Sequence, residues 1–262
     1  MAGCTTSGPL AWFSDSGFGF GPTSGIQSQM THMYFARQLN NSATRIYTWT
    51  EGSGTITWAD IGHASYLSPL SDCVSQDGTN MCQNDNDWIR GGWVENGRIG
   101  FMWDAKDGSS SFGNMQYPWV MAIEVDQSTM NLIYQPIIAC GGNSWAWPAV
   151  AVNNNGALGF SAAWTNGSSY PSTNELDRDA VSAQSCGATC YNVQVGSQGT
   201  NGPQNDQWGD FLTVRVASGS SNTFVGTAFA IQCPNSDCSQ VAQPIQPMFL
   251  WFGRLSDQTP TP

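Results

Sequence analysis

Alternating apolar and polar residues recur along the chain in paired runs, each pair separated by a short polar turn. One pair occupies residues 88–103 around an Asn-Gly turn, and a second occupies residues 147–160 around another. An Asn-Gly dipeptide between two alternating runs is the strongest short-range signal for a β-hairpin. The pattern predicts strands throughout and no convincing helix, so the expected fold class is all-β.

These hairpins repeat at a nearly constant interval. Trp88 and Trp147 lie 59 residues apart, and Trp208, which begins a third copy, follows 61 residues later. A second hairpin pattern is shared by residues 33–47 and 120–134. Each unit then contains four antiparallel strands in about sixty residues, which is typical of a β-propeller blade. The alternative is a β-sandwich that contains a duplicated hairpin.

The repeats are expected to form one domain. We predict a single β-propeller-like domain over residues 1–255, followed by a polar tail at 256–262. The expected repeat units lie near residues 12–60, 80–135, 140–200 and 205–255. Closed propellers usually have about four to eight blades, so four units are at the low end for a closed ring. The chain is therefore expected to form a partial propeller, or one that another chain completes.

Two further expectations concern the later part of the chain. The apolar run at residues 247–255 is expected to be a strand that completes the first blade, because a circularly offset start is how propellers close. Residues 172–186 are polar, acidic and irregular. Without an apolar alternation they predict a long loop.

The composition excludes two classes of partner. Charged residues make up 10% of the chain, and 8 Lys and Arg stand against 19 Asp and Glu, for a net charge of −11. This charge would repel a phosphate backbone, so nucleic acid is not an expected partner. The sequence contains no run of about eighteen apolar residues, so no membrane span is predicted either.

Eight cysteines, most of them in close pairs, favour disulfides and therefore an extracellular location. Two histidines and the lack of a Cys-x-x-Cys motif make a zinc site a poor alternative. Proximity in the sequence does not fix the pairing. The expected bridges are Cys73–Cys82, Cys186–Cys190 and Cys233–Cys238, with Cys4–Cys140 formed by the two remaining cysteines.

Three segments together resemble a known group of proteins. They are residues 147–160 (WPAVAVNNNGALGF), residues 170–172 (YPS) and residues 207–211 (QWGDF), the last followed by Phe224. Over residues 80–255 the chain is similar to bacterial secreted proteins with sialidase-like β-propeller repeats. The resemblance implies a propeller fold but no particular activity, since many members have none assigned. The Asp-box of the sialidases is absent, because the nearest segment, residues 75–80, lacks its Trp.

The arrangement of Asn and Asp suggests a site. Asp85 and Asp87 precede Trp88, while Asp206 and Asp210 flank Trp208. In a propeller these positions enter the innermost strands and would surround the mouth of the central channel. Clustered carboxylate and amide oxygens suit Ca²⁺, so these four aspartates are candidate metal ligands. The alternative is that they form Asx-turns at the strand entries.

Paired carboxylates could also hydrolyse glycosides, which requires two such groups about 5–9 Å apart. No nucleophile elbow, zinc motif or phosphate-binding loop is present to suggest other chemistry. The candidate catalytic residues are Asp87, Asp104, Glu124, Asp206 and Asp210.

Aromatic side chains could bind a glycan, because the apolar faces of sugars stack on aromatic rings. Trp119, Trp145 and Tyr170 are the candidates for this role. Two functions are therefore open. The chain is expected to be a non-catalytic extracellular module, either glycan-binding or a building block of a surface assembly. The alternative is a glycan-cleaving enzyme that uses two channel-mouth carboxylates.

Overall fold

The computed structural model describes most of the chain, and the architecture below refers to that part. The described residues are 26–27, 32–53, 55–68, 72–85, 88–139, 142–178, 191–203, 206–209, 212–218, 222–233 and 245–254. They form strands, turns and connecting loops. No helix in these ranges is long and apolar enough to cross a membrane.

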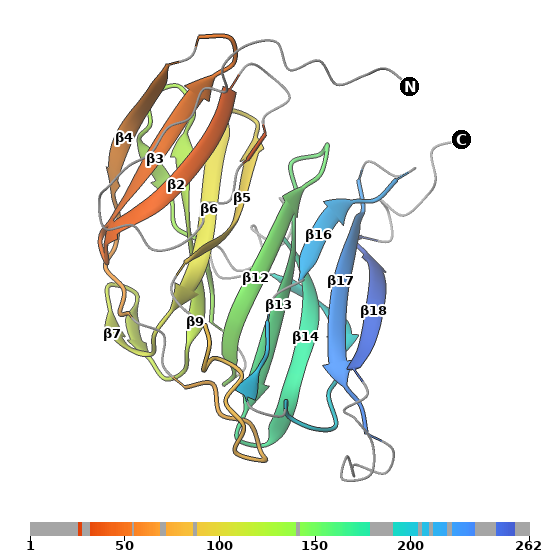
Figure 1. The fold of residues 1–262 in the computed structure, drawn as a ribbon. Coiled ribbons are helices and arrows are strands. Elements are labelled where there is room, and N and C mark those ends of the chain that lie inside the picture. Colours follow the sequence, from red (N-terminus) through yellow and green to blue (C-terminus); the bar gives the residue numbers. More distant parts are fainter. Residues whose placement is uncertain are drawn as a thin grey trace, which may run out of the picture.

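Four antiparallel sheets follow one another along the chain (Figure 1). Sheet 1 has the order β1 (Ile26–Gln27), β2 (His32–Asn40), β3 (Ala43–Thr50) and β4 (Ile56–Gly62). Sheet 2 has the order β5 (Ile89–Glu95), β6 (Arg98–Ala105), β9 (Trp119–Asp126) and β10 (Leu132–Tyr134), with β11 (Ile137–Ile138) also paired to β9.

The second half of the chain repeats this organisation. Sheet 3 has the order β12 (Ser144–Val152), β13 (Leu158–Asn166), β14 (Ser169–Arg178) and β15 (Asn192–Ser197). Sheet 4 has the order β16 (Thr213–Val216), β17 (Phe224–Ile231) and β18 (Ile245–Phe252). A short separate hairpin joins β7 (Gly108–Ser110) to β8 (Gly113–Met115).

The sheets are arranged as propeller blades. Neighbours in the sequence are neighbours in each sheet, and the first strand of one sheet contacts the first strand of the next, in the series β1, β5, β12 and β16. Figure 1 shows the four sheets side by side, with sheet 1 at one end of the row and sheet 4 at the other. The fold is therefore a β-propeller architecture of successive blades, and the sandwich alternative, which needs two facing sheets, does not describe it.

The tight turns follow from their sequences. Asn96 and Gly97 join β5 to β6 with positive φ at both positions, 44° and 74°. A two-residue hairpin turn of this kind requires φ > 0 twice, which Asn and Gly accept at the lowest cost. At the β12–β13 turn, Gly156 alone is positive, and the Asn153 side chain accepts hydrogen bonds from the backbone N–H groups of Asn155 and Ala157.

The structure corrects the predicted match between the hairpins at residues 33–47 and 120–134, which do not occupy equivalent places in their sheets. Residues 33–47 form β2 and β3, the second and third strands of sheet 1. Residues 120–134 form β9 and β10, the third and fourth strands of sheet 2. The match is therefore offset by one strand. Hairpins share an alternating pattern wherever they lie in a blade, so alternation alone does not fix their position.

Two other expectations were wrong. The strand at the C-terminal end, β18, pairs with β17 along its whole length, from Ile245 opposite Ile231 to Phe252 opposite Phe224, and so belongs to the last sheet and not to the first. Of the segment predicted as a loop, residues 172–178 continue β14 as far as Arg178, and residues 179–186 lie outside the described residues. Polar side chains of this strand are buried between sheets, which conceals the strand from a hydrophobicity pattern.

Three apolar layers hold the row of sheets together, one between each pair of neighbours. Glycine lets large rings enter these layers. Trp93 lies across Gly100, its partner on β6, where an added Cβ would overlap the indole. Phe224 of sheet 4 lies against Gly159 of sheet 3, where an added Cβ would be 2.5 Å from the ring. Burying such a side chain contributes about 1.5–3 kcal/mol.

This packing predicts the effect of a single methyl group. Gly159→Ala should destabilise the protein by roughly 1–3 kcal/mol, because the added Cβ overlaps the ring of Phe224 and forces the two sheets apart. The free energy of unfolding in urea measures the effect. Gly62→Ala is the matched control, since Gly62 also lies in a strand and a Cβ added there would have nothing within 4 Å. Equal stability of the two variants would contradict the packing described.

Candidate functional site

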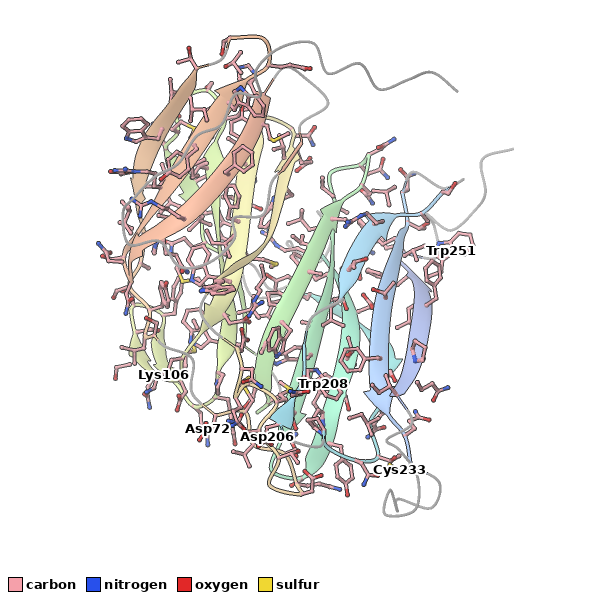
Figure 2. The ribbon with its side chains drawn as sticks, in the orientation of Figure 1. Asp72, Lys106, Asp206, Trp208, Cys233 and Trp251 are labelled. Atoms are coloured by element: carbon pink, nitrogen blue, oxygen red, sulfur yellow. A yellow bond between two sulfur atoms is a disulfide. The ribbon has the colours of Figure 1, made fainter. Side chains whose placement is uncertain are left out.

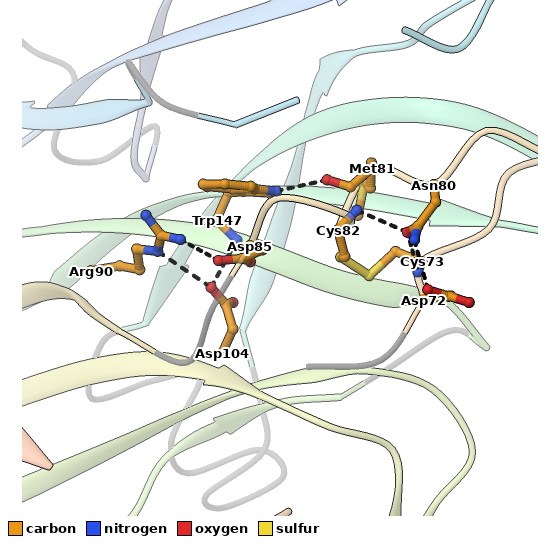
Figure 3. The surroundings of a disulfide bond; sticks show 9 residues. All are labelled: Asp72, Cys73, Asn80, Met81, Cys82, Asp85, Arg90, Asp104 and Trp147. Carbon is orange, nitrogen blue, oxygen red and sulfur yellow. Dashed lines mark hydrogen bonds and ion pairs between the residues drawn. A yellow bond between two sulfur atoms is a disulfide. The ribbon is translucent and has the colours of Figure 1, made fainter. Parts of the chain in front are cut away.

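The linker between sheets 1 and 2 lies at the lower end of the molecule in Figure 2, where Asp72 and Asp206 are labelled. A disulfide between Cys73 and Cys82 closes a loop in this linker, as the cysteine spacing predicted (Figure 3). The Asn80 side chain, inside the loop, accepts hydrogen bonds from the backbone N–H groups of both cysteines, at 2.9 and 3.0 Å. These bonds fix the loop in one conformation.

The linker is attached to the connection between sheets 3 and 4. Gly202 donates its N–H to Asp77 at 2.9 Å, and Asn80 donates its N–H to Asp206 at 2.6 Å. Burial on its own would raise the pKa of Asp77, but hydrogen bonds from Ser75, Thr79 and Gly202 outweigh it and hold the pKa below its usual value. Residues more than a hundred positions apart are thereby joined at this end of the molecule.

Of the other six cysteines, the structure describes Cys233. Cys233 is disulfide-bonded, and its partner lies outside the described residues. Cys4, Cys140, Cys186, Cys190 and Cys238 also lie outside them, so their predicted pairings stay predictions.

Beneath the linker, two predicted site residues come together around an arginine (Figure 3). Asp85 precedes β5, Arg90 lies on β5, and Asp104 lies on β6. The Arg90 guanidinium donates to Asp85 through Nη2, and its Nε is 3.8 Å from Asp104 Oδ2. Both carboxyl groups are fully buried, and the arginine side chain is 18% exposed.

Trp147 completes this cluster from sheet 3. Its ring lies over the Arg90 guanidinium at 4.3 Å, and its backbone N–H points to Asp104 Oδ2 at 3.4 Å. Its other partners hold it in place, because the indole N–H donates to the Met81 carbonyl at 3.1 Å and Gly209 lies against the ring. Trp147 has a φ of +59° at a register shift in β12. A bulky residue in the left-handed region is strained, and the surrounding contacts impose that strain.

The protonation of the pair follows from its surroundings. Burial raises the pKa of Asp104 well above its usual range, and the charge of Asp85 and a hydrogen bond with it raise the pKa further. Arg90 and the Trp147 N–H act in the opposite direction. The raised pKa favours the neutral form of Asp104, and in that form one carboxylate faces one guanidinium.

This geometry does not suit the hydrolysis of a glycoside. The two carboxyl groups share a hydrogen bond and are fully buried, whereas hydrolysis requires two groups about 5–9 Å apart on either side of a sugar. Of the remaining candidates, Asp206 is bound to the linker, and Asp87 and Asp210 lie outside the described residues. Within the described ranges no group of three or more His, Cys, Asp or Glu side chains could hold a metal ion, so Ca²⁺ stays a prediction that depends on Asp87 and Asp210.

Glu124, the fifth catalytic candidate, joins two sheets. It lies buried on β9, 3.3 Å from Arg98 of sheet 2 and 3.5 Å from Arg178 of sheet 3. Arg178 also lies over the ring of Tyr134, at 4.7 Å. With an ion pair on each side, this carboxylate contributes to blade packing.

The structure overturns two of the predicted glycan-stacking residues. Trp119 and Trp145 are buried, and the Trp119 indole N–H donates to the Lys106 carbonyl at 3.0 Å. Neither has a ring face available to a sugar, because each packs in the layer between two sheets. Tyr170 is half-buried at the start of β14.

Exposed aromatic rings occur instead on the outer face of sheet 4, which has no neighbouring sheet on that side in the described structure (Figure 1). Phe249 is 75% exposed and Trp251 is 57% exposed, and both point outward from β18. Figure 2 shows Trp251 on this sheet, far from Asp206 at the lower end of the molecule. The indole N–H of Trp251 donates to the Thr223 hydroxyl at 2.7 Å, which fixes the ring.

A groove of about 350 Å³ runs beside these rings. Sequence reasoning missed it because the exposed face of an end sheet becomes evident only when the order of the sheets is known. Its signal is the run of consecutive apolar residues within the segment 247–255, which is predicted to complete the first blade. The residues that line the groove are Thr213, Arg215, Val216, Ala217, Ser218, Val225, Thr227, Phe249 and Trp251.

A buried acid between sheets 3 and 4 was also missed. Glu175 of β14 lies opposite Ser161, with its carboxyl group against Gly226 of sheet 4, where an added Cβ would overlap it. Burial raises the pKa of Glu175 to about 8, and the Ser161 hydroxyl only partly opposes the shift. The carboxyl group is therefore protonated at neutral pH in the folded protein.

The acid–arginine cluster predicts a large effect of one substitution. Arg90→Gln should destabilise the protein by roughly 3–5 kcal/mol at neutral pH, because it leaves a buried carboxylate without its cation. Unfolding in urea measures the loss, and adding Asp85→Asn to the variant should restore part of it. Arg45→Gln, which removes an exposed ion pair with Asp60, is the control and should change stability little. An Arg90→Gln protein as stable as the control would refute this role.

Glu175 predicts how stability depends on pH. The folded pKa is about 8 against an ordinary 4.5, so the unfolded chain releases this proton first as the pH rises. The free energy of unfolding should fall between pH 5 and 8, by up to roughly 1.4 kcal/mol per pH unit from this group. Glu175→Gln should flatten the decline, whereas the exposed control Glu51→Gln should not. Parallel profiles for wild type and Glu175→Gln would exclude the assignment.

Comparison with known proteins gives distant structural similarities. No known protein family and no curated protein matches the sequence. Among solved structures, an α-L-arabinanase of Penicillium chrysogenum complexed with arabinobiose is 11% identical, with 84% of this chain and 71% of that chain covered and a TM-score of 0.39. An ulvan lyase of polysaccharide lyase family 25 is 8% identical, with 79% of this chain and 51% of that chain covered and a TM-score of 0.41. A thermostable family-43 glycoside hydrolase is 10% identical, with 79% of this chain and 63% of that chain covered and a TM-score of 0.40. The chain spans about half to seven tenths of these proteins, and similarity at this level assigns no activity.

Proposed function

We propose that this chain is an extracellular, non-catalytic propeller module that binds glycans through the outer face of sheet 4. The observation that carries the proposal is the groove of about 350 Å³ beside two exposed aromatic rings, Phe249 and Trp251. Ligand sites are typically concave, largely apolar and supplied with a few polar groups that fix orientation. The disulfide between Cys73 and Cys82 supports an oxidising, extracellular environment.

The groove has the mixture of surfaces that a sugar requires. Trp251 is held by its bond to Thr223, so binding does not have to immobilise a rotating ring. The hydroxyl groups of Thr213, Ser218 and Thr227 line the same groove and can exchange hydrogen bonds with sugar hydroxyls. Apolar faces of a sugar would then stack on the aromatic rings while its edges meet polar groups.

The enzyme alternative has weaker support. The two carboxyl groups that the structure brings together, Asp85 and Asp104, are buried against an arginine and too close to flank a substrate. Among the described residues that line the groove, none carries a carboxyl group. Incubation with a panel of polysaccharides is therefore expected to release no new reducing or unsaturated chain ends.

A second candidate, a building block of a surface assembly, is favoured by a different observation. The exposed large aromatic side chains of the described residues all lie on the two end sheets: Trp58 on sheet 1, with 55% exposed, and the pair on sheet 4. Contiguous exposed apolar surface is characteristic of protein interfaces. A second chain that completes the propeller would pack against the exposed faces of sheets 1 and 4 and bury these side chains.

One experiment tests both functions. Trp251→Ala should abolish the retention of the protein on an immobilised glycan panel, because the stacking surface is removed while the sheet keeps its apolar inner face. Trp58→Ala, at an equally exposed tryptophan of the opposite end sheet, is the control and should bind as the wild type does. Self-association of each protein is measured in parallel by analytical ultracentrifugation. Loss of self-association in Trp251→Ala, without any glycan binding by the wild type, would reject the glycan function in favour of assembly.

A further inference from the structure

The register of sheet 4 places the groove side chains in two rows that run across the strands. Arg215, Val225 and Trp251 lie opposite one another on β16, β17 and β18. The adjacent row contains Thr213, Thr227 and Phe249, in the same strand order. Each row therefore has an aromatic ring at the β18 end, and one of them has a cation at the β16 end.

The dimensions of a sheet set the size of the ligand. Neighbouring strands are about 4.8 Å apart, so Arg215 and Trp251 are separated by about 10 Å across the sheet. Trp251 and Phe249, two residues apart on one strand, are about 7 Å apart. A sugar stacked on the rings would thus have a second sugar above Val225, whose small side chain leaves room, with its outer edge at Arg215.

The groove has a charge opposite to that of the protein. Among the described residues that line it, Arg215 is the one charged side chain, whereas the whole chain carries −11. The guanidinium is oriented by a hydrogen bond from Nη1 to the Val214 carbonyl at 2.8 Å. A guanidinium offers five N–H donors in a planar fork that matches carboxylate and sulfate oxygens. Repulsion from distant acidic residues is screened beyond about 10 Å at 0.1 M salt.

We infer that the ligand is an anionic glycan of at least two sugars, with an apolar sugar face on Trp251 and Phe249 and an acidic group of the next sugar on Arg215. The inference rests on the proposed glycan-binding function and specifies its ligand class. Threonine hydroxyls of the second row contact the ring hydroxyls, and the cation selects for charge. A neutral glycan would gain the stacking contacts but would leave the guanidinium without a charged partner.

Calorimetric titration of the intact protein with three oligosaccharides of equal length tests the inference. The probes are an oligogalacturonate, which carries carboxylates, a sulfated carrageenan oligosaccharide and a neutral xylo-oligosaccharide. The wild type should bind at least one of the two anionic probes about tenfold or more tightly than the neutral one, and raising the salt should weaken that binding. The preferred anionic probe tells carboxylate recognition from sulfate recognition.

Two variants separate the inference from the proposed function. Arg215→Gln should lower the affinity for the anionic probe to that for the neutral probe without changing the latter, and Arg215→Lys should restore part of the preference. Arg45→Gln, on the opposite end sheet, is the control and should leave all affinities unchanged. Equal binding of neutral and anionic probes, unaffected by Arg215→Gln, would overturn the anionic specificity while glycan binding stands. Failure of every probe to bind would overturn both.

Discussion

Each sheet of this protein depends on a neighbour to cover its faces. The layers between sheets are built from large rings seated on glycines, such as Trp93 on Gly100 and Phe224 on Gly159, and these contacts leave no space for a side chain in place of either glycine. An inner sheet is therefore apolar on both faces, as the uninterrupted burial of residues 99–105 in β6 shows. Within the described residues, an end sheet has one face covered by a neighbouring sheet, and its other face carries exposed side chains such as Trp58 and Trp251.

Polar groups in these layers are stabilised by local partners. Arg90 lies between Asp85 and Asp104, while Glu124 faces Arg98 and Arg178. Buried ion pairs of this kind contribute little net stability, because the cost of desolvating the charges opposes their attraction. The pair of Glu124 and Arg178 does fix how sheets 2 and 3 are aligned, since a displaced sheet would leave a charge without its partner. The strained Trp147, held by Met81 and Arg90, acts in the same way between sheets 2 and 3.

The all-β class, the hairpins and the blade organisation could be predicted because strand alternation and Asn-Gly turns are local. The pairing of Cys73 with Cys82 was local as well. Burial was harder to predict, because it depends on which sheet faces which. Trp119 and Trp251 are both tryptophans in strands, yet one is enclosed and the other open, and only the order of the sheets distinguishes them. The polar strand β14 was missed for the same reason.

The position of the groove follows from this order. Along β17 and β18, residues that face sheet 3, such as Phe224 and Phe252, pack in an apolar layer, while the alternate residues Val225 and Trp251 face outward. Substitutions on the outward set change no contact between sheets, so that face can acquire rings, hydroxyls and a cation without disturbing the row. The buried carboxyl groups have no such freedom, because each is constrained by the sheet opposite. The composition of the end face and the rigidity of the layers are therefore separable properties of the same strands.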